Sequence, residues 1–325
     1  MGCLWPAEEQ EVSALTDLLT TYFWASAVRL AAPMFIAAIG ETVVQRSGVF
    51  NIGIEGMMLI GAFVGVAGGV LFDAAWMGLL AAVVVTALIG FLYGIVVAGF
   101  RADQVVAGVG LNIIALGVTS LLRSTWLASE IETVSPGAIG AGALPGLSRI
   151  PYLGPVFFTQ SPIVYAALLI LPVVAFFLFR TKPGLLLRAV GEQAIAADTA
   201  GVRVVGIRIA ALSFGGAMAG LAGGYLSLIA TSGVFIDNMT LGRGFLAIAI
   251  TIFGRWNPFY VALAALFFGA AEALQFSGQA LFGESVPTPV LLMTPFVLAI
   301  VAWVVMGRSG AAPADLGRPF LRSEQ

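Results

Sequence analysis

Long runs of apolar residues, uninterrupted by a charged side chain, recur along most of the chain. The longest lies between Asp73 and Arg101, where the 27 residues 74–100 contain no Asp, Glu, Lys or Arg. At a rise of about 1.5 Å per residue, a helix of this length reaches roughly 40 Å, which is enough to span a bilayer. Similar uncharged runs occupy residues 56–72, 104–122, 150–179, 209–236 and 285–307. The pattern therefore predicts a chain that crosses a membrane many times.

The apolar runs predict an all-α fold, a polytopic membrane helical bundle of about nine transmembrane helices, with eight or ten as the neighbouring solutions. We place the spans at 22–40, 52–72, 74–100, 104–127, 161–179, 208–230, 238–254, 257–276 and 288–307. The span at 238–254 is the weakest, because Gly242, Arg243 and Gly244 interrupt its start. A short or broken helix is an equal alternative there.

The spans divide the chain into three parts. Residues 1–21 form an acidic N-terminal segment, residues 22–307 a transmembrane domain, and residues 308–325 a C-terminal tail. Basic residues that flank membrane spans are retained in the cytoplasm. With nine crossings, one assignment places 11 of the 15 Lys and Arg residues on the same side. We therefore expect the N-terminus outside the cytoplasm and the C-terminal tail inside it.

The amino-acid composition then excludes several classes of protein and of functional site. Only 10% of the residues are charged, against roughly 25% in an ordinary soluble domain, which excludes a soluble globular protein. With no histidine and one cysteine, the chain cannot build a His/Cys zinc site or a Ser-His-Asp triad, so we expect no enzyme and no metal site. The only lysine, Lys182, lies outside any phosphate-binding GxxxxGK(S/T) motif, so any ATP is bound by another subunit. A net charge of -2 offers no basic surface for nucleic acid.

A polar stretch at the start of the second span is the first candidate site. Residues 45–58, QRSGVFNIGIEGMM, bring Asn51, Gly53 and Glu55 to the beginning of an apolar helix. Because a charge inside a membrane is costly, Glu55 must face the bundle interior, find a partner or carry a proton. We expect it to bond the unpaired amides of a helix break or to line the translocation path, and an acid wetted by cytoplasmic water is the third possibility. Weaker candidates of the same kind are Gln104, Asn112, Glu272 and Gln275.

The loop at 180–208 is the second candidate site. It carries five basic residues, and its middle, from Glu192 to Ala200, contains good helix formers that end at Gly201. The pattern predicts a short cytoplasmic helix. Ala196, Ala197 and Ala200 share one face of that helix, and small apolar side chains exposed to water indicate a docking surface for a partner. A merely solvated basic loop is the alternative.

Glycines recur four residues apart in three of the spans. The repeats are Gly61, Gly65 and Gly69, then Gly90 and Gly94, then Gly216, Gly220 and Gly224. Such repeats let helix backbones approach closely. We expect them to form contacts within the chain's own bundle, and a dimer contact is the alternative.

Several motifs resemble the permease subunits of ABC importers. IAADTAG at 195–201 fits the xAAxxxG core of the loop by which such permeases engage their ATPase, with Ile195 in place of the usual acid. NIGIEGMM at 51–58, ADQVVAGVGLNIIALG at 102–117 and GFLAIAITIFGRWNP at 244–258 look like the permeases for branched-chain amino acids, ribose-type sugars and nucleosides. The likeness covers nearly all of residues 30–307 and is strongest to the nucleoside and simple-sugar branch.

This resemblance implies roles and partners. It assigns the coupling of ATP hydrolysis to Arg188, Glu192, Ala196, Ala197, Asp198 and Gly201. It also implies an ATPase subunit that binds the ATP, a second permease chain that is a paralogue or a copy of this one, and an extracytoplasmic solute-binding protein, in the inner membrane of a bacterium.

Other functions remain as alternatives. The few charges within the spans favour a neutral solute, such as a nucleoside or a simple sugar, over a branched-chain amino acid. An ion- or proton-coupled secondary transporter would use Glu55 and Glu272 as proton sites, but the chain shows no clear inverted repeat. An intramembrane enzyme would need a nucleophile and a base, and the sequence offers no such set.

Overall fold

The computed structural model describes residues 21–127, 152–282 and 312–320, with a few single residues between 139 and 150 and between 293 and 304. Every element in these ranges is helical. The α-helices are α2 (Thr21–Arg46), α3 (Ile54–Phe72), α4 (Ala75–Gly94), α5 (Gln104–Leu122), α7 (Leu153–Phe157), α8 (Pro162–Arg180), α9 (Lys182–Glu192), α10 (Ala194–Thr199), α11 (Val204–Tyr225), α12 (Arg243–Phe253) and α13 (Pro258–Phe282). Single π-helical turns extend three of them, namely η1 (Ile95–Gly99) after α4, η2 (Arg123–Leu127) after α5 and η4 (Leu226–Ala230) after α11.

Seven of the described helices are long and apolar enough to cross a membrane: α2, α3, α4 with η1, α5 with η2, α8, α11 with η4, and α13. They confirm seven of the nine predicted spans, with small shifts at their ends. The predicted span at 238–254 becomes the short helix α12 of 11 residues, so the broken-helix alternative is right. The span predicted at 288–307 and residues 1–20 lie wholly or mostly outside the described residues.

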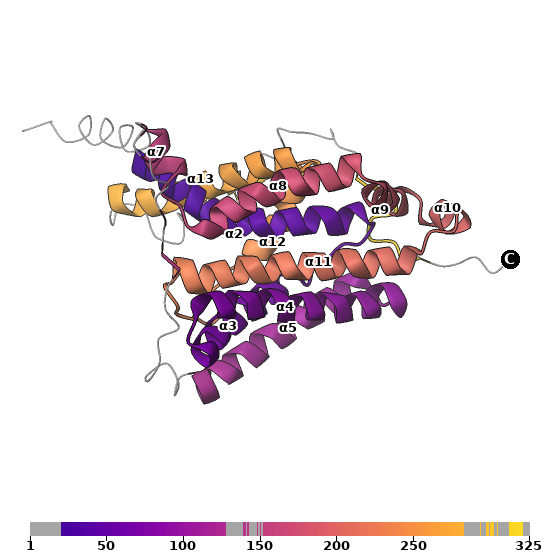
Figure 1. Ribbon diagram of the computed structural model, residues 1–325, viewed down its shortest axis with the longest axis horizontal. Helices are drawn as coiled ribbons and strands as arrows, with labels where there is room; N and C mark the ends of the chain where they lie inside the picture. The colour runs from indigo at the N-terminus through magenta and orange to yellow at the C-terminus, as the bar shows by residue number, and fades with distance from the viewer. Residues whose placement is uncertain are drawn as a thin grey trace, which may run out of the picture.

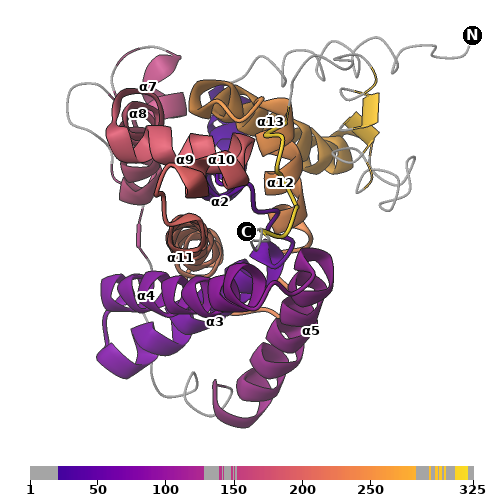
Figure 2. The same ribbon diagram turned by 90° about the vertical axis from the view of Figure 1, so that its right-hand side faces the viewer.

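The long helices lie side by side, and α11 runs through the centre of the bundle (Figure 1). Helix α11 contacts α3, α4 and α2. Figure 2, which looks along the bundle, shows α3 and α4 on one side of α11 and α2 on the other. Helices α9 and α10 lie together at one end, and α7 lies at the opposite end (Figure 1). The end that carries α9 and α10 is called the loop end below.

Glycine brings α11 against α3 and α4. A Cβ atom on Gly61 of α3 would lie 2.6 Å from the Cα atom of Gly220 of α11. A Cβ atom on Gly90 of α4 would lie 2.3 Å from the carbonyl oxygen of Leu212. Real Cβ atoms essentially never come within 3.0 Å of another heavy atom, so a larger residue requires the helices to separate. The predicted glycine repeats thus form contacts inside the chain's own bundle.

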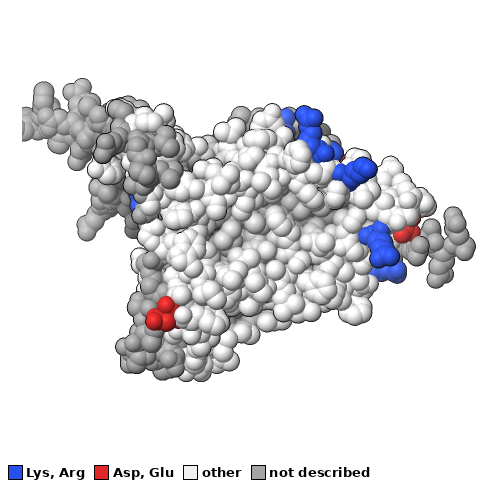
Figure 3. Space-filling model, viewed as in Figure 1, with Lys and Arg blue, Asp and Glu red and all other residues white. Residues whose placement is uncertain are grey.

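Outer helices leave most of their apolar surface exposed. In the most apolar part of each span, 83% of the residues of α2 are buried but only 17% of those of α5. Figure 3 shows a broad side surface almost free of charge, with Lys and Arg gathered toward the loop end. A surface of this kind fits contact with lipid, because hydrocarbon accepts apolar side chains and penalises charges.

Candidate functional site

The chain breaks between α2 and α3, and a side chain from α5 bridges the break. Residues 47–53 are not helical. Oδ1 of Asn112 accepts a hydrogen bond from the N–H of Gly56 at 2.8 Å, and its Nδ2 donates to the carbonyl oxygen of Ile52 at 3.0 Å. The first amides of a helix have no partner within the helix, so Asn112 satisfies one of them for α3. Gly53 lies close to α5 as well, since a Cβ atom on it would lie 2.8 Å from Cδ2 of Leu111 and that side chain would have to move aside.

Glu55, in the first turn of α3, holds the start of α12. Its Oε1 accepts from the N–H of Gly242 at 2.8 Å, and its Oε2 accepts from the N–H of Gly244 at 2.7 Å. The positive end of the α12 dipole also favours a carboxylate here. Glu55 is only 8% exposed, so a buried acid is matched to two otherwise free donors. The sequence predicted that Glu55 would bond the free amides of a helix break, and the start of α12 supplies those amides.

An ion pair between Arg243 and Glu272 ties the start of α12 to α13. The two side chains are 15% and 11% exposed, and Nη1 of Arg243 also donates to the carbonyl oxygen of Met239 at 3.2 Å. Each charge of the pair therefore neutralises the other at the start of α12. The other candidate on α13, Gln275, is buried one turn further on.

A fully buried acid, Glu41 of α2, lies near the break and belongs to none of the motifs read from the sequence. Its Oε1 accepts from Nε2 of Gln45 at 2.9 Å and from the backbone N–H of Asn51 at 3.4 Å. Oε1 of Gln45 in turn accepts from Nε1 of Trp256 at 2.7 Å. Asn51 therefore takes part in this hydrogen-bond network through its backbone N–H, and its side chain has no hydrogen-bond partner within the described residues. The sequence pattern that could have revealed this buried acid is an acid and an amide four residues apart, Glu41 and Gln45, in an apolar helix.

Gln104, at the start of α5, completes this polar cluster. Its Oε1 accepts from the N–H of Phe50 at 2.8 Å, and its carbonyl oxygen accepts from the hydroxyl of Tyr93 at 3.0 Å. The cluster formed by Glu41, Gln45, Asn51, Glu55, Gln104 and Asn112 is called the helix-break site below. It joins α2, α3, α5 and α12 through hydrogen bonds to backbone amides.

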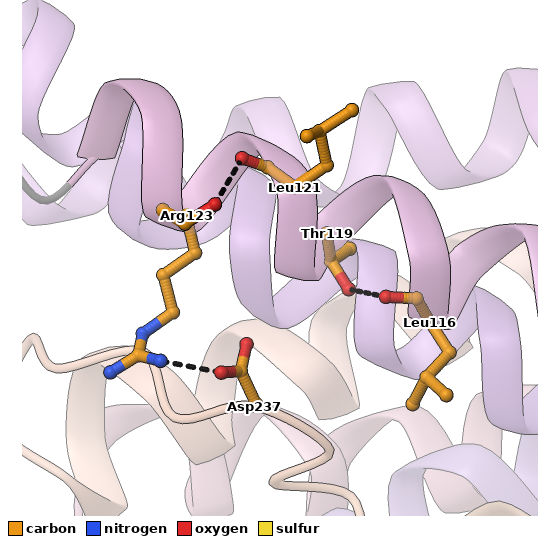
Figure 4. A network of polar contacts seen from close by, with 6 residues as sticks. Leu116, Thr119, Leu121, Arg123 and Asp237 are labelled. Carbon is orange, nitrogen blue, oxygen red and sulfur yellow. Dashed lines mark hydrogen bonds and ion pairs between the residues drawn. The ribbon is translucent and has the colours of Figure 1, made fainter.

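A cavity of about 360 Å³ lies beside the segment that leads into α12. Its polar lining residues are Arg29, Tyr225, Thr231, Asp237, Asn238 and Arg243. The size falls within the range of small-molecule sites, roughly 300 to 1,000 Å³. Figure 4 shows the ion pair from Arg123 to Asp237, 2.5 Å long, that joins this segment to the start of η2. Both of its side chains are 44% exposed, so the pair adds little stability.

The loop end carries two helices where the sequence predicts one. The expected helix over 192–200 is wrong in extent, because α9 ends at Glu192 and α10 covers only Ala194–Thr199. Gln193 between them has φ -150° and ψ 87°, a conformation that a helix cannot continue through. The earlier start of α9 follows from Thr181, whose Oγ1 accepts from the N–H of Gly184 at 3.2 Å as an N-cap.

The alanines of α10 do not share one face. Ala197 is 6% exposed and packs with Val190, Ala194 and Val204 in a small apolar cluster. Ala196 and Ala200 are exposed, and so is Ile195. The prediction that Ala197 shares an exposed face with Ala196 and Ala200 is therefore wrong, because Ala197 packs inward. The exposed apolar residues here are Ile195, Ala196 and Ala200, which are called the α10 face below.

The other predicted loop residues lie around these helices. Gly201 has φ +85°, and its N–H donates to the carbonyl oxygen of Asp198 at 2.9 Å, so it ends α10 as the sequence predicts. The guanidinium of Arg188 lies over the ring of Phe179, 5.3 Å from its centre. Oε2 of Glu192 accepts from the N–H of Ala314 at 3.4 Å.

Seven long apolar helices in the described ranges, a helix break held by buried polar groups and a helical loop at one end define a multi-pass membrane transport protein. Residues 24–309 match the family described as the branched-chain amino acid transport system permease component. The match covers most of the chain, and the chain belongs to this family.

Three relatives align with almost the whole chain. The guanosine ABC transporter permease NupQ of Bacillus subtilis is 37% identical in an alignment of length 307 that covers 91% of this chain and 95% of the relative. The nucleoside ABC transporter permease NupC of Lactococcus lactis is 34% identical in an alignment of length 304 that covers 90% of this chain and 95% of the relative. The glucose ABC transporter permease TsgB13 of Haloferax volcanii is 29% identical in an alignment of length 329, gaps included, that covers 92% of this chain and 84% of the relative. The resemblance to the nucleoside and sugar branch is confirmed.

Proposed function

We propose that this permease component imports a nucleoside, with a simple sugar as the second choice. The observation that carries the proposal is the alignment with permeases named for guanosine and for nucleosides over 91% and 90% of the chain. A relative named for glucose supports the second choice. The cavity beside α12 combines apolar side chains with six polar or charged ones, which can form hydrogen bonds with the hydroxyl and amide groups of such a solute.

In this proposal the chain supplies the path through the membrane, and a separate subunit binds and hydrolyses ATP. The α10 face is the contact for that ATPase subunit, because it presents small apolar side chains at an end of the bundle. A second permease chain and an extracytoplasmic solute-binding protein complete the importer in the bacterial inner membrane. The transport cycle then moves helices of this chain without chemistry on its side chains.

The helix-break site has a mechanical role in this cycle. Helices α3 and α12 each begin beside a side chain that another helix supplies, Asn112 for α3 and Glu55 for α12. We assign to Glu55 the holding of α12 rather than the transfer of a proton. An opening of the path that shifts α12 relative to α3 must stretch or exchange these hydrogen bonds.

Uptake into vesicles tests the proposed solute. The permease is reconstituted with its ATPase, its partner permease and its binding protein, and labelled guanosine, glucose and leucine are offered with and without ATP inside the compartment that holds the ATPase. We expect guanosine to accumulate only with ATP and unlabelled nucleosides to compete. Preferred uptake of leucine would assign the chain to amino acids. Uptake by the chain alone, driven by a proton gradient, would refute the importer.

Fusions after Gln325 test the orientation. The charge bias places the loop end, with Arg46, Lys182 and Arg255, in the cytoplasm together with the C-terminus. A fluorescent protein fused after Gln325 should therefore be bright, and alkaline phosphatase at the same place should be inactive. The same two reporters, fused after residue 236 as a control for the opposite side, should give the reverse result. Active phosphatase after Gln325 would overturn the assignment.

A further inference from the structure

The C-terminal segment 312–320 lies against the loop end, where the last part of the coloured chain passes beside α9 and α10 (Figure 2). Phe320 packs on the apolar cluster that includes Val190, Ala197 and Val204. The N–H of Gly317 donates to the carbonyl oxygen of Gly48 at 3.1 Å, in the turn that follows α2. One short segment thus contacts both the helical loop and the connection between α2 and α3.

Asp315 supplies α10 with the N-terminal cap that the residue preceding the helix does not provide. Its Oδ2 accepts from the N–H of Ala194 at 2.7 Å, and its backbone N–H donates to the carbonyl oxygen of Gly191 at 3.0 Å. Gln193, the residue before α10, places no capping side chain on these amides in the described structure. A carboxylate that accepts from a backbone amide makes one of the stronger protein hydrogen bonds. Asp315 therefore fixes both sides of the break between α9 and α10.

Arg208 of α11 joins the segment to the connection after α2. It is 2% exposed. Its Nη1 donates to the carbonyl oxygen of Arg318 at 3.0 Å, and its Nε donates to the carbonyl oxygen of Ser47 at 3.3 Å. Gly191 also touches this connection, because a Cβ atom on it would lie 2.2 Å from the carbonyl oxygen of Arg46. The loop, the segment and the end of α2 therefore form one bonded unit.

We propose that the segment 312–320 positions the α9–α10 loop for ATP-driven transport, with Asp315 as the positioning residue. The segment fixes α10 relative to the turn at Ser47 and Gly48, which leads within eight residues to Glu55 and the start of α12. A push on the α10 face then displaces the helix-break site instead of being absorbed by a hinge at Gln193. The inference rests on the proposed ATPase contact, and it adds a part of the chain that no motif in the sequence marks.

Asp315→Ala tests the inference by two independent measurements. Hydrogen exchange of the purified permease reports directly on α10, and we expect the amides of 194–199 to exchange about ten- to a hundred-fold faster, the factor for one lost hydrogen bond to a charged group. In the full importer we expect the number of solute molecules moved per ATP to fall at least about five-fold at equal amounts of assembled complex. Asp315→Asn keeps one acceptor oxygen and should restore both values in large part. Ala312→Ser, in the same segment at an exposed position, should leave both unchanged.

The two measurements separate failure of the inference from failure of the proposed function. Unchanged exchange in Asp315→Ala would show that the segment does not hold α10. Faster exchange with an unchanged ratio of solute to ATP would show that α10 needs no positioning for transport. If the wild-type chain neither binds an ATPase nor uses ATP, the proposed function is wrong and the coupling role falls with it, while the exchange data still decide whether Asp315 holds α10.

Discussion

Glu55→Leu is expected to abolish uptake and to destabilise the protein, whereas Glu55→Gln should retain uptake at reduced stability. Leucine leaves the N–H groups of Gly242 and Gly244 without their acceptors. Each buried donor left unpaired costs about 1 to 3 kcal/mol. Glutamine keeps one side-chain oxygen and the same shape, so one of the two hydrogen bonds survives and α12 remains in place.

Thermal denaturation in detergent and ATP-driven uptake in vesicles measure the two effects of the Glu55 variants. Asp73→Asn is the matched carboxylate control, because Asp73 is exposed after α3 and asparagine tolerates its φ of 48°, so stability should change by less than about 1 kcal/mol. Glu55→Gln that folds with wild-type stability but transports nothing would contradict the holding role. It would point instead to a proton carried by the carboxyl group.

Ala196→Arg should separate the permease from its ATPase without disturbing the bundle. Ala196 is exposed on α10, so an arginine there reaches solvent and leaves the apolar cluster around Ala197 intact. The long charged side chain should exclude the partner surface that accepts small residues. We expect the ATPase subunit to be lost on purification and ATP-driven uptake to fall to background.

Co-purification of the ATPase, with uptake in the same vesicles, measures the effect of Ala196→Arg. Ala196→Ser is the control, since it keeps a small side chain at the same position and should behave as wild type. Ala197→Arg should fail for another reason, because a charge at a position only 6% exposed disrupts the cluster behind α10 and loosens the loop itself. Normal binding and uptake in Ala196→Arg would remove the α10 face from the proposed contact.

The long helices were predictable because hydrocarbon imposes a simple rule on the chain. Any segment that crosses it must be apolar for about 20 residues and must bond its own backbone. Five of the seven helices could therefore be read from uncharged runs, while α2 and α13, which contain Arg29, Glu41 and Glu272, were placed from their overall apolar character. The rule weakens where a helix need not span. Helix α12 has 11 residues, and only its interrupted start at Gly242 to Gly244 indicated a helix shorter than a full span.

The site was predictable in its residues but not in its pairings. Glu55 and Asn112 stand out as polar side chains in apolar segments, yet nothing local reveals that Glu55 accepts from Gly242, 187 residues away. Glu41 was missed because the network that it joins is completed only on folding, when Gln45, its neighbour in α2, accepts from Trp256 in the turn beyond α12. The burial of Ala197 was missed for the same reason, since Val204 and Phe320 cover it from outside its own helix.

The glycines of this chain fall into two groups that differ in how freely they can be substituted. A Cβ atom on Gly61 would meet the backbone of Gly220 in α11, so a side chain gained there requires a simultaneous adjustment in α11. A Cβ atom on Gly110 or Gly117 of α5 would meet no atom within 4 Å in the described part of the chain. Among descendants of this sequence, the α3–α11 crossing should therefore change only by correlated substitutions, while the two α5 positions can drift singly to any residue that lipid accepts.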